Sequence, residues 1–406
     1  MASAIRKQSN RMKRKSKQSN LSKMWDTVKS IYKGMGEIDI AFFMIIMILL
    51  VMGIVMMFSA SYAWAIDEGK AGSYYAQKQL MMAGAGLVAM LVLSVIDYHI
   101  YANKYIAYGL YGVTVILLIL VLLIGDTDKG AQRWIQVGSF QFQPSEIMKL
   151  AIIILFSYLI SKNYNRMGTF KYGVMPYLVL LGIVAVLMML QPHLSGTLLI
   201  SMTAVTLLFV GGMKIKHLLE LAGIGILGLG SIIAYKIMVE GYSYFGNRIE
   251  SWKNPFGENA SDTTWQTCQS LIAIGSGGLF GLGLGESRQK YLYLPESKND
   301  FVFSIVCEEL GFVGAVTVIL LFALFVFRGF YIATKAPDKF GMLMAVGLTV
   351  QIGYQALINI AVVSNFVPNT GISLPFFSYG GTALGMQLAQ MGILLNISRQ
   401  SIIQKQ

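Results

Sequence analysis

Charged side chains are scarce in this chain of 406 residues. Only 13% of the residues are Asp, Glu, Lys or Arg, whereas hydrophobic residues make up 55% and the mean hydropathy is +0.61. A soluble domain carries about 25% charged residues. The composition therefore excludes an ordinary water-soluble globular protein and is typical of a polytopic membrane protein.

Cysteine, histidine and acidic residues are also few. The two cysteines, Cys268 and Cys307, indicate neither a disulfide framework nor a metal site. We expect both to be unpaired, because Cys307 falls within an apolar helix. Asp and Glu number 20 against 32 Lys and Arg, so the formal net charge is +12.

Much of this positive charge lies in residues 1–38. They hold ten Lys or Arg and two acidic residues, without the apolar core of a signal peptide. A nucleic-acid-binding arm and a cytoplasmic tail against anionic lipid both fit such a segment, and the apolar chain that follows favours the tail. We therefore expect a disordered cytoplasmic tail, contact with membrane lipids and no nucleic-acid partner.

Ten apolar segments follow this tail. They are continuous runs, unlike the alternating strands of a membrane barrel, and about 20 residues suffice for a spanning helix. Lys and Arg gather in alternate connections, so the positive-inside rule places both termini in the cytoplasm. The predicted fold is an all-α polytopic membrane protein over 39–398, followed by a cytoplasmic end at 399–406. Its ten transmembrane helices are expected at 39–62, 78–97, 105–124, 144–161, 172–190, 195–211, 218–238, 301–329, 341–363 and 379–397.

One connection, residues 239–300 between the seventh and eighth predicted helices, is much longer than the others and is expected on the extracytoplasmic side. It contains the apolar, glycine-rich stretch SLIAIGSGGLFGLGLG at 270–285. We expect this stretch to fold onto the membrane or to enter it, where irregular backbone needs burial in protein. The glycines favour close backbone packing over a phosphate-binding loop, because no strand and helix unit surrounds them.

Asp300 is the carboxylate best placed for chemistry. It ends the string LPESKND at 294–300, directly before an apolar helix. Ionisable groups at such a position commonly mark a substrate path or a chemical site, and a helix-capping role is the structural alternative. Glu296 lies four residues earlier and would share a helix face with Asp300 if this stretch is helical. Otherwise it is a solvated loop residue.

Other polar side chains are candidates for substrate binding. Arg133 and Trp134, at 125–143, suit a phosphate and a sugar face, although tryptophan is also a common interfacial anchor. Glu146 and Lys149 are spaced i, i+3 on one helix. We expect Lys149 to pair with Glu308 near a substrate cavity, or else to form a buried structural pair. Three more cations flank the Asp300 segment and are either anion ligands or solvated: Arg288, Lys290 and Lys298.

Two further groups are expected to be structural. Amides recur every four residues on one predicted helix, where they favour contacts between helices, at Gln351, Gln355 and Asn359. Ser378 and Tyr379 are expected to pack closely.

Six motifs together resemble the SEDS family (shape, elongation, division and sporulation; FtsW, RodA and SpoVE). They are MMFSASY at 56–62, GAQRWIQVG at 130–138, QPSEIMK at 143–149, QPHLSGT at 191–197, QSLIAIGSGGLFGLGLGESRQKYLYLPESKNDFVFSIVCEELG at 269–311 and PNTGISLPFFSYGG at 368–381. The resemblance runs from about residue 39 to residue 398. MMFSASY and the long basic tail look closer to FtsW and SpoVE than to RodA.

The resemblance implies an inverting glycosyltransferase that polymerises lipid II at the outer face of the bacterial cytoplasmic membrane. It implies a single-pass class B penicillin-binding protein as partner, with other divisome or sporulation proteins. Asp300 matches the family's catalytic aspartate, which implies a general base. A divalent cation (Mg²⁺ or Mn²⁺) on Asp300 and Glu296 is the alternative. His193 stands where the family often has aspartate, so a hydrogen-bonded structural histidine is expected there.

Two other functions compete with the enzyme. One is a lipid II flippase or other transporter, and the other is a scaffold that recruits the penicillin-binding protein without catalysis. Transporters often contain internal repeats, and none is evident here. The polar motifs gather on one predicted membrane face, which favours catalysis over alternating access.

Overall fold

The computed structural model describes residues 36–128, 131–137, 140–191, 193–240, 252–257 and 262–401. Most of the predicted basic tail at 1–38 lies outside the described residues. The same holds for most of the C-terminal segment at 399–406 and for part of the connection at 239–300.

The molecule is a helical bundle, and each of the ten predicted apolar segments overlaps a helix. These helices are α2 (Ile40–Asp67), α3 (Tyr74–Leu93), α4 (Lys104–Ile124), α5 (Pro144–Asn163), α7 (Met175–Leu190), α8 (Leu194–Val210), α9 (Ile215–Glu240), α12 (Val302–Lys335), α13 (Lys339–Val363) and α14 (Gly381–Arg399). Short helical turns occur at η1 (Tyr98–Ala102), η2 (Tyr164–Arg166) and α6 (Phe170–Gly173). Helix α12 ends just before Pro337, later than predicted.

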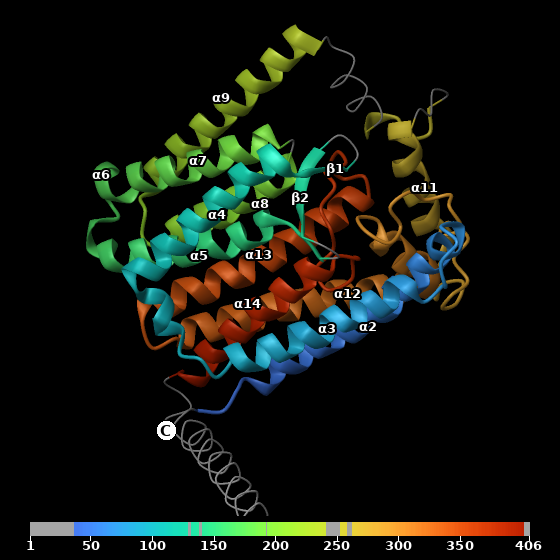
Figure 1. The fold of residues 1–406 in the computed structure, drawn as a ribbon, viewed down its shortest axis with the longest axis horizontal. Helices are drawn as coiled ribbons and strands as arrows, with labels where there is room; N and C mark the ends of the chain where they lie inside the picture. Colours follow the sequence, from blue (N-terminus) through green and yellow to red (C-terminus); the bar gives the residue numbers. More distant parts are fainter. Residues whose placement is uncertain are drawn as a thin grey trace, which may run out of the picture.

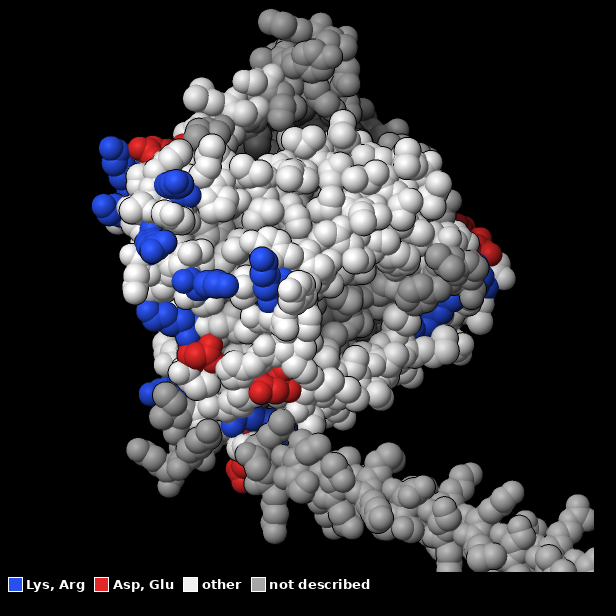
Figure 2. Space-filling model, turned by 60° about the vertical axis from the view of Figure 1, so that its left-hand side comes forward, with Lys and Arg blue, Asp and Glu red and all other residues white. Residues whose placement is uncertain are grey.

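Seven helical stretches within the described residues are long and apolar enough to cross a membrane. They are Ile40–Asp67, Tyr74–Leu93, Lys104–Ile124, Pro144–Arg166, Phe170–Leu190, Val302–Lys335 and Lys339–Val363. Figure 2 shows Lys and Arg gathered at one end of the molecule, a broad face with almost no charge beside them, and a smaller group of charges at the far end. Large apolar side chains such as Val88, Val113 and Phe327 are exposed. An uncharged band between charged ends is the surface of a multi-pass membrane protein.

Helices α5 and α13 form the centre of the bundle. In their most apolar stretches 83% and 72% of the residues are buried, against 22–39% in α2, α3, α4 and α12. Figure 1 shows α5 and α13 between α4 and α7 on one side and α2 and α3 on the other. Polar side chains on these two helices therefore face protein and not lipid.

Two elements were not predicted. An antiparallel sheet of three strands, in the order β1–β2–β3, is formed by β1 (Asp126–Asp128), β2 (Ala131–Val137) and β3 (Phe140–Phe142). The all-α prediction is wrong here, because these three strands lie in the connection between α4 and α5. Helix α11 (Asp262–Ser276) lies within the connection at 239–300 and packs against α12.

The glycine-rich stretch packs backbone to backbone against a break in α12. The break is Gly311, whose φ is 66° and ψ is −165°. The N–H groups of Leu282 and Gly283 donate to the carbonyls of Glu308 and Glu309 at 2.9 and 3.1 Å. A Cβ added to Gly281 would lie 2.1 Å from the Glu309 carbonyl oxygen. Close backbone packing is therefore the role of these glycines, as predicted, whereas entry of the stretch into the membrane stays a prediction.

We predict that Gly281→Ala destabilises the protein more than Gly285→Ala. The two glycines have φ values of +83° and +86°, so alanine adds comparable backbone strain at both, of about 1–3 kcal/mol. A Cβ at Gly285 meets nothing within 4 Å, whereas at Gly281 it clashes with the α12 backbone. The clash should cost roughly another 1–3 kcal/mol. Thermal unfolding of both variants in detergent measures the difference, and equal midpoints would contradict this packing.

Candidate functional site

Asp300 lies in a turn that precedes α12 and is half-buried. The N-cap position of α12 is Phe301, without a side-chain capping hydrogen bond, so Asp300 is not the capping residue. Its carboxylate Oδ2 lies 3.3 Å from the point where a Cβ on Gly371 would stand. Glycine at position 371, with φ +69°, therefore lets the backbone approach this carboxylate closely, where a side chain would crowd it.

Three consecutive carbonyls hold this turn to distant elements. The Lys298 carbonyl accepts from the Tyr379 N–H at 2.8 Å, and the Asn299 carbonyl accepts from Ser378 Oγ at 2.6 Å. The Asp300 carbonyl accepts from Asn359 Nδ2 on α13 at 2.7 Å. Ser378 and Asn359 thus orient the Asp300 turn, a role that their sequence pattern did not reveal. Fixing three successive peptide groups leaves the Asp300 backbone little freedom.

Glu296 does not share a helix face with Asp300. Its φ is 57°, and its carbonyl accepts from the N–H groups of Asn299 and Phe301, so the stretch is a turn. The Glu296 carboxylate accepts from Asn299 Nδ2 at 2.5 Å. Among the described residues no group of three His, Cys, Asp or Glu side chains is arranged to hold a metal ion. A divalent cation near Asp300 and Glu296 would need oxygen ligands from substrate or water.

Lys298 is held between the ends of α2 and α3. Its ammonium lies 3.3 Å from Glu68 Oε1 and 3.9 Å from the centre of the Tyr75 ring. Hydrogen bonds from Lys70 and Tyr75 lower the pKa of Glu68 to about 2, so this carboxylate is charged at neutral pH. Lys298 is therefore an ordered cation beside the Asp300 turn and not a solvated loop lysine.

Lys290 and Glu308 have structural partners instead of facing a substrate. The Lys290 ammonium, almost fully buried, lies 3.0 Å from Glu309 Oε1 and 3.0 Å from Ser59 Oγ. The Glu308 carboxylate accepts from Ser287 Oγ at 2.5 Å and from the Arg288 N–H at 2.9 Å. These contacts fasten the loop at 285–290 to α12. The Arg288 side chain itself is exposed.

The predicted pair between Lys149 and Glu308 is wrong. Lys149 Nζ lies 2.7 Å from Glu146 Oε2 on its own helix and 3.4 Å from Gln355 Oε1 on α13. Only 5% of the Lys149 side chain is exposed, so the alternative of a buried structural pair describes the contact. Lys149 failed to reach Glu308 because a neighbour three residues away satisfies it first.

The amides of α13 connect this ion pair with the Asp300 turn. Gln355 accepts from Lys149 and donates to the Ser373 carbonyl at 3.0 Å. One turn later, Asn359 donates to the Ile372 carbonyl at 2.6 Å and to the Asp300 carbonyl. Contacts between elements are therefore confirmed for these amides, and Gln351 likewise donates to Gln390 on α14. Glu146, Lys149 and Asp300 thus flank one polar path through the bundle.

Arg133 and Trp134 lie on β2. Successive side chains of a strand point to opposite faces, so these two do not form one continuous surface. Arg133 shares its face with the buried Ile135. Near it, His193 Nδ1 accepts from the Gly196 N–H at 3.0 Å and caps α8. Burial and the nearby Arg133 charge lower the pKa of His193 to about 3. The expectation of a hydrogen-bonded structural histidine is confirmed.

Comparison with known proteins places this arrangement in a family. A model described as a cell cycle protein, shared by FtsW, RodA and SpoVE, matches residues 40–403. The chain belongs to this family. Stage V sporulation protein E of Bacillus subtilis is 40% identical over 366 residues, which cover 89% of this chain and 97% of that protein. A probable peptidoglycan glycosyltransferase FtsW of Geobacter sp. strain M18 is 36% identical over 89% of this chain and 96% of its own length.

Two solved structures are similar to this chain in fold. A structure described as "Structural coordination of polymerization and crosslinking by a peptidoglycan synthase complex" has a TM-score of 0.72 at 26% identity and covers 89% of this chain. It matches over 98% of that chain. The rod shape determining protein RodA of Thermus thermophilus has a TM-score of 0.66 at 27% identity, over 90% of this chain and 98% of its own.

We predict that Lys290→Ala destabilises the protein by about 3–5 kcal/mol, because it leaves the buried Glu309 carboxylate without its cation. Arg288→Ala, two residues away and exposed, should leave stability within about 0.5 kcal/mol. The double variant Lys290→Met/Glu309→Gln should recover part of the loss. Unfolding midpoints in detergent measure all three, and a neutral Lys290→Ala would contradict the buried pair.

We predict that His193→Asn reduces the loss of stability at acid pH. The pKa of His193 in the folded protein lies below the ordinary value of 6.5. Above pH 6.5 its titration therefore takes nothing from the free energy of unfolding. The free energy of unfolding falls as the pH drops toward 3, because His193 becomes protonated in the unfolded chain at a higher pH than in the folded protein. The effect should reach about 1–2 kcal/mol at pH 5. Asparagine keeps a capping acceptor and does not titrate. The unfolding midpoint of the wild type should fall more between pH 7.5 and pH 5 than the midpoint of the variant. Equal falls would refute the lowered pKa of His193.

Proposed function

We propose that this protein is a peptidoglycan glycosyltransferase that polymerises lipid II during cell division or sporulation. Curated relatives covering about nine tenths of the chain carry that activity or a sporulation role in their names. The observation that carries the proposal is the Asp300 turn. Three consecutive carbonyls are held by α13 and the 378–379 segment, and glycine at position 371 lets its backbone approach the carboxylate closely.

In the proposed reaction Asp300 acts as the general base. Its carboxylate accepts the proton of the acceptor sugar hydroxyl while that oxygen attacks the anomeric carbon and the bond to the lipid pyrophosphate breaks. A positioned base contributes about 10²–10⁴ in rate. The fixed backbone of the turn holds the carboxylate in one place, which reduces the entropy lost in reaching the transition state. A single displacement of this kind inverts the anomeric configuration.

The leaving pyrophosphate needs positive charge. Lys298 is ordered beside the Asp300 turn, and Arg133 supplies a guanidinium on β2. Either suits a phosphate oxygen, Arg133 through a forked pair of N–H groups. A divalent cation, when bound, would supply further electrostatic stabilisation, and Asp300 and Glu296 are its candidate protein ligands. We assign Lys290 and Glu308 to the support of the loop and not to the substrate.

We further propose ten membrane-spanning helices with both termini in the cytoplasm and the Asp300 turn on the extracytoplasmic side. The Lys- and Arg-rich end of the bundle supports this orientation. The turn and this basic end lie at opposite ends of α12. A class B penicillin-binding protein is the proposed partner, because a similar solved structure is a complex that coordinates polymerisation with crosslinking.

We predict that Asp300→Asn abolishes polymerisation of labelled lipid II, with a loss of at least about 10²-fold, while the unfolding midpoint stays near wild type. The assay uses the purified protein alone and with its class B partner, with and without Mg²⁺ or Mn²⁺. Glu286→Gln removes an exposed carboxylate from the same connection and is the matched control. Equal product from a folded Asp300→Asn variant would remove Asp300 from the mechanism. No product from wild type under any condition would favour a flippase or a scaffold.

A further inference from the structure

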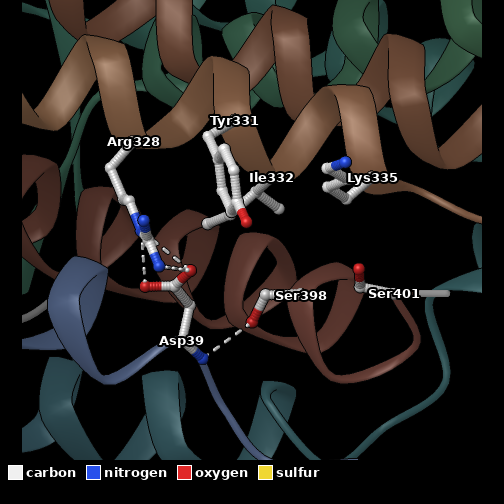
Figure 3. Close-up of a pocket in the computed structure, with 7 residues that line it drawn as sticks. All are labelled: Asp39, Arg328, Tyr331, Ile332, Lys335, Ser398 and Ser401. Atoms are coloured by element: carbon white, nitrogen blue, oxygen red, sulfur yellow. Dashed lines mark hydrogen bonds and ion pairs between the residues drawn. The ribbon is translucent and has the colours of Figure 1, made fainter. Parts of the chain in front are cut away.

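A small cavity lies at the end of the bundle opposite to Asp300. It has a volume of about 130 Å³ and is formed by the start of α2 and the last turns of α12 and α14. Figure 3 shows the seven residues that line it: Asp39, Arg328, Tyr331, Ile332, Lys335, Ser398 and Ser401. A single water needs about a tenth of this volume, so a polyatomic ligand fits.

The wall of the cavity is held rigidly by an ion pair. Arg328 Nε lies 2.9 Å from both carboxylate oxygens of Asp39, and Arg328 Nη2 lies 2.9 Å from Oδ2. The Asp39 N–H donates to Ser398 Oγ, which joins α2 to α14. The Tyr331 ring covers the guanidinium, with 4.5 Å between the ring centre and Cζ. The side of the cavity formed by Asp39, Arg328 and Tyr331 is therefore held in place by these contacts.

Four hydrogen-bond donors at this cavity have no protein acceptor among the described residues. They are Arg328 Nη1, the Tyr331 hydroxyl, Lys335 Nζ and Ser401 Oγ. The lining contains two cations and one carboxylate, so its net charge is positive. Several N–H and O–H donors around one cavity, with excess positive charge, are the chemistry that recognises a phosphate group. Metal cations would be repelled by this excess positive charge.

We propose that this cavity binds a phosphate group, either as the headgroup of an anionic lipid or as free phosphate. Tyr331, Lys335 and Ser401 donate to the phosphate oxygens, while Arg328 contributes Nη1 and remains paired with Asp39. The cavity lies toward the end of the molecule where Figure 2 shows Lys and Arg side chains gathered. Basic pockets between helices at the cytoplasmic leaflet suit anionic lipid headgroups. A bound phosphate would tie α12 to α14 at this end.

The test measures binding by titration calorimetry on the full chain in neutral detergent. The probes are dihexanoyl phosphatidylglycerol, inorganic phosphate, and dihexanoylglycerol, which lacks the phosphate. We predict binding of at least one phosphate probe, and Tyr331→Phe/Lys335→Gln should weaken it by about tenfold or more. Lys104→Gln, an exposed lysine at the first residue of α4, is the matched control and should leave affinity unchanged.

The outcomes separate the two sources of phosphate. Tighter binding of the lipid than of inorganic phosphate assigns a headgroup site, and comparable binding assigns a site for free phosphate. Ser401→Ala gives a second, smaller perturbation should the double variant fold poorly. The proposal is overturned if neither phosphate probe binds at concentrations up to about 10 mM. Such a result means a binding free energy weaker than about −3 kcal/mol. Equal affinity in wild type and a folded double variant does the same.

Discussion

The structure depends on two adjacent carboxylates buried inside α12. Glu308 and Glu309 are 1% and 0% exposed, and a charge taken out of water is costly unless it finds partners. Most of their partners come from one loop, through Ser287, the Arg288 N–H and the Lys290 ammonium, while Ser59 Oγ on α2 donates to Glu309 at 2.6 Å. Satisfying them therefore folds residues 285–290 back against the helix. The next ten residues lead from this anchored loop directly to Asp300, so the carboxylates help to define where the candidate site lies.

The break in α12 and the glycines opposite it form the second half of this arrangement. At Gly311 the helical hydrogen bonds are interrupted, and the carbonyls of Glu308 and Glu309 accept from the glycine-rich stretch instead. Two backbones approach this closely only where no Cβ intervenes, as at Gly277 and Gly281. The same two glutamates thus bind neighbouring segments through both their side chains and their main chains. The interrupted helix therefore offers free backbone carbonyls and charged side chains together, and both bind the irregular segment that packs against it.

Hydropathy predicted the helices because the bilayer imposes a simple length and composition on each. All ten predicted segments overlap helices. Close packing of the glycines was predicted because no strand and helix unit of a phosphate-binding loop surrounds them. Polar pairings were harder to predict, because they depend on tertiary geometry. Lys149 was assigned to Glu308, yet Glu146 on the same helix and Gln355 on α13 satisfy it. The strand at Ala131–Val137 was missed because it is short and the adjacent Trp134 and Ile135 break a simple apolar and polar alternation.

The amide stripe on α13 shows how a buried helix can serve a site at its end. Gln355 and Asn359 sit one turn apart in the centre of the bundle, and both hold the 372–373 backbone. Asn359 also holds the Asp300 carbonyl, whereas Gln355 reaches the Glu146 and Lys149 pair on α5. Neutral amides can donate and accept at once, so they connect charged groups without adding a charge that burial would penalise. A carboxylate on α13 would bring its own desolvation cost, and an aliphatic side chain would leave the Asp300 and Ile372 carbonyls unsatisfied. Position 359 therefore favours an amide for a physical reason that applies whatever substrate reaches Asp300.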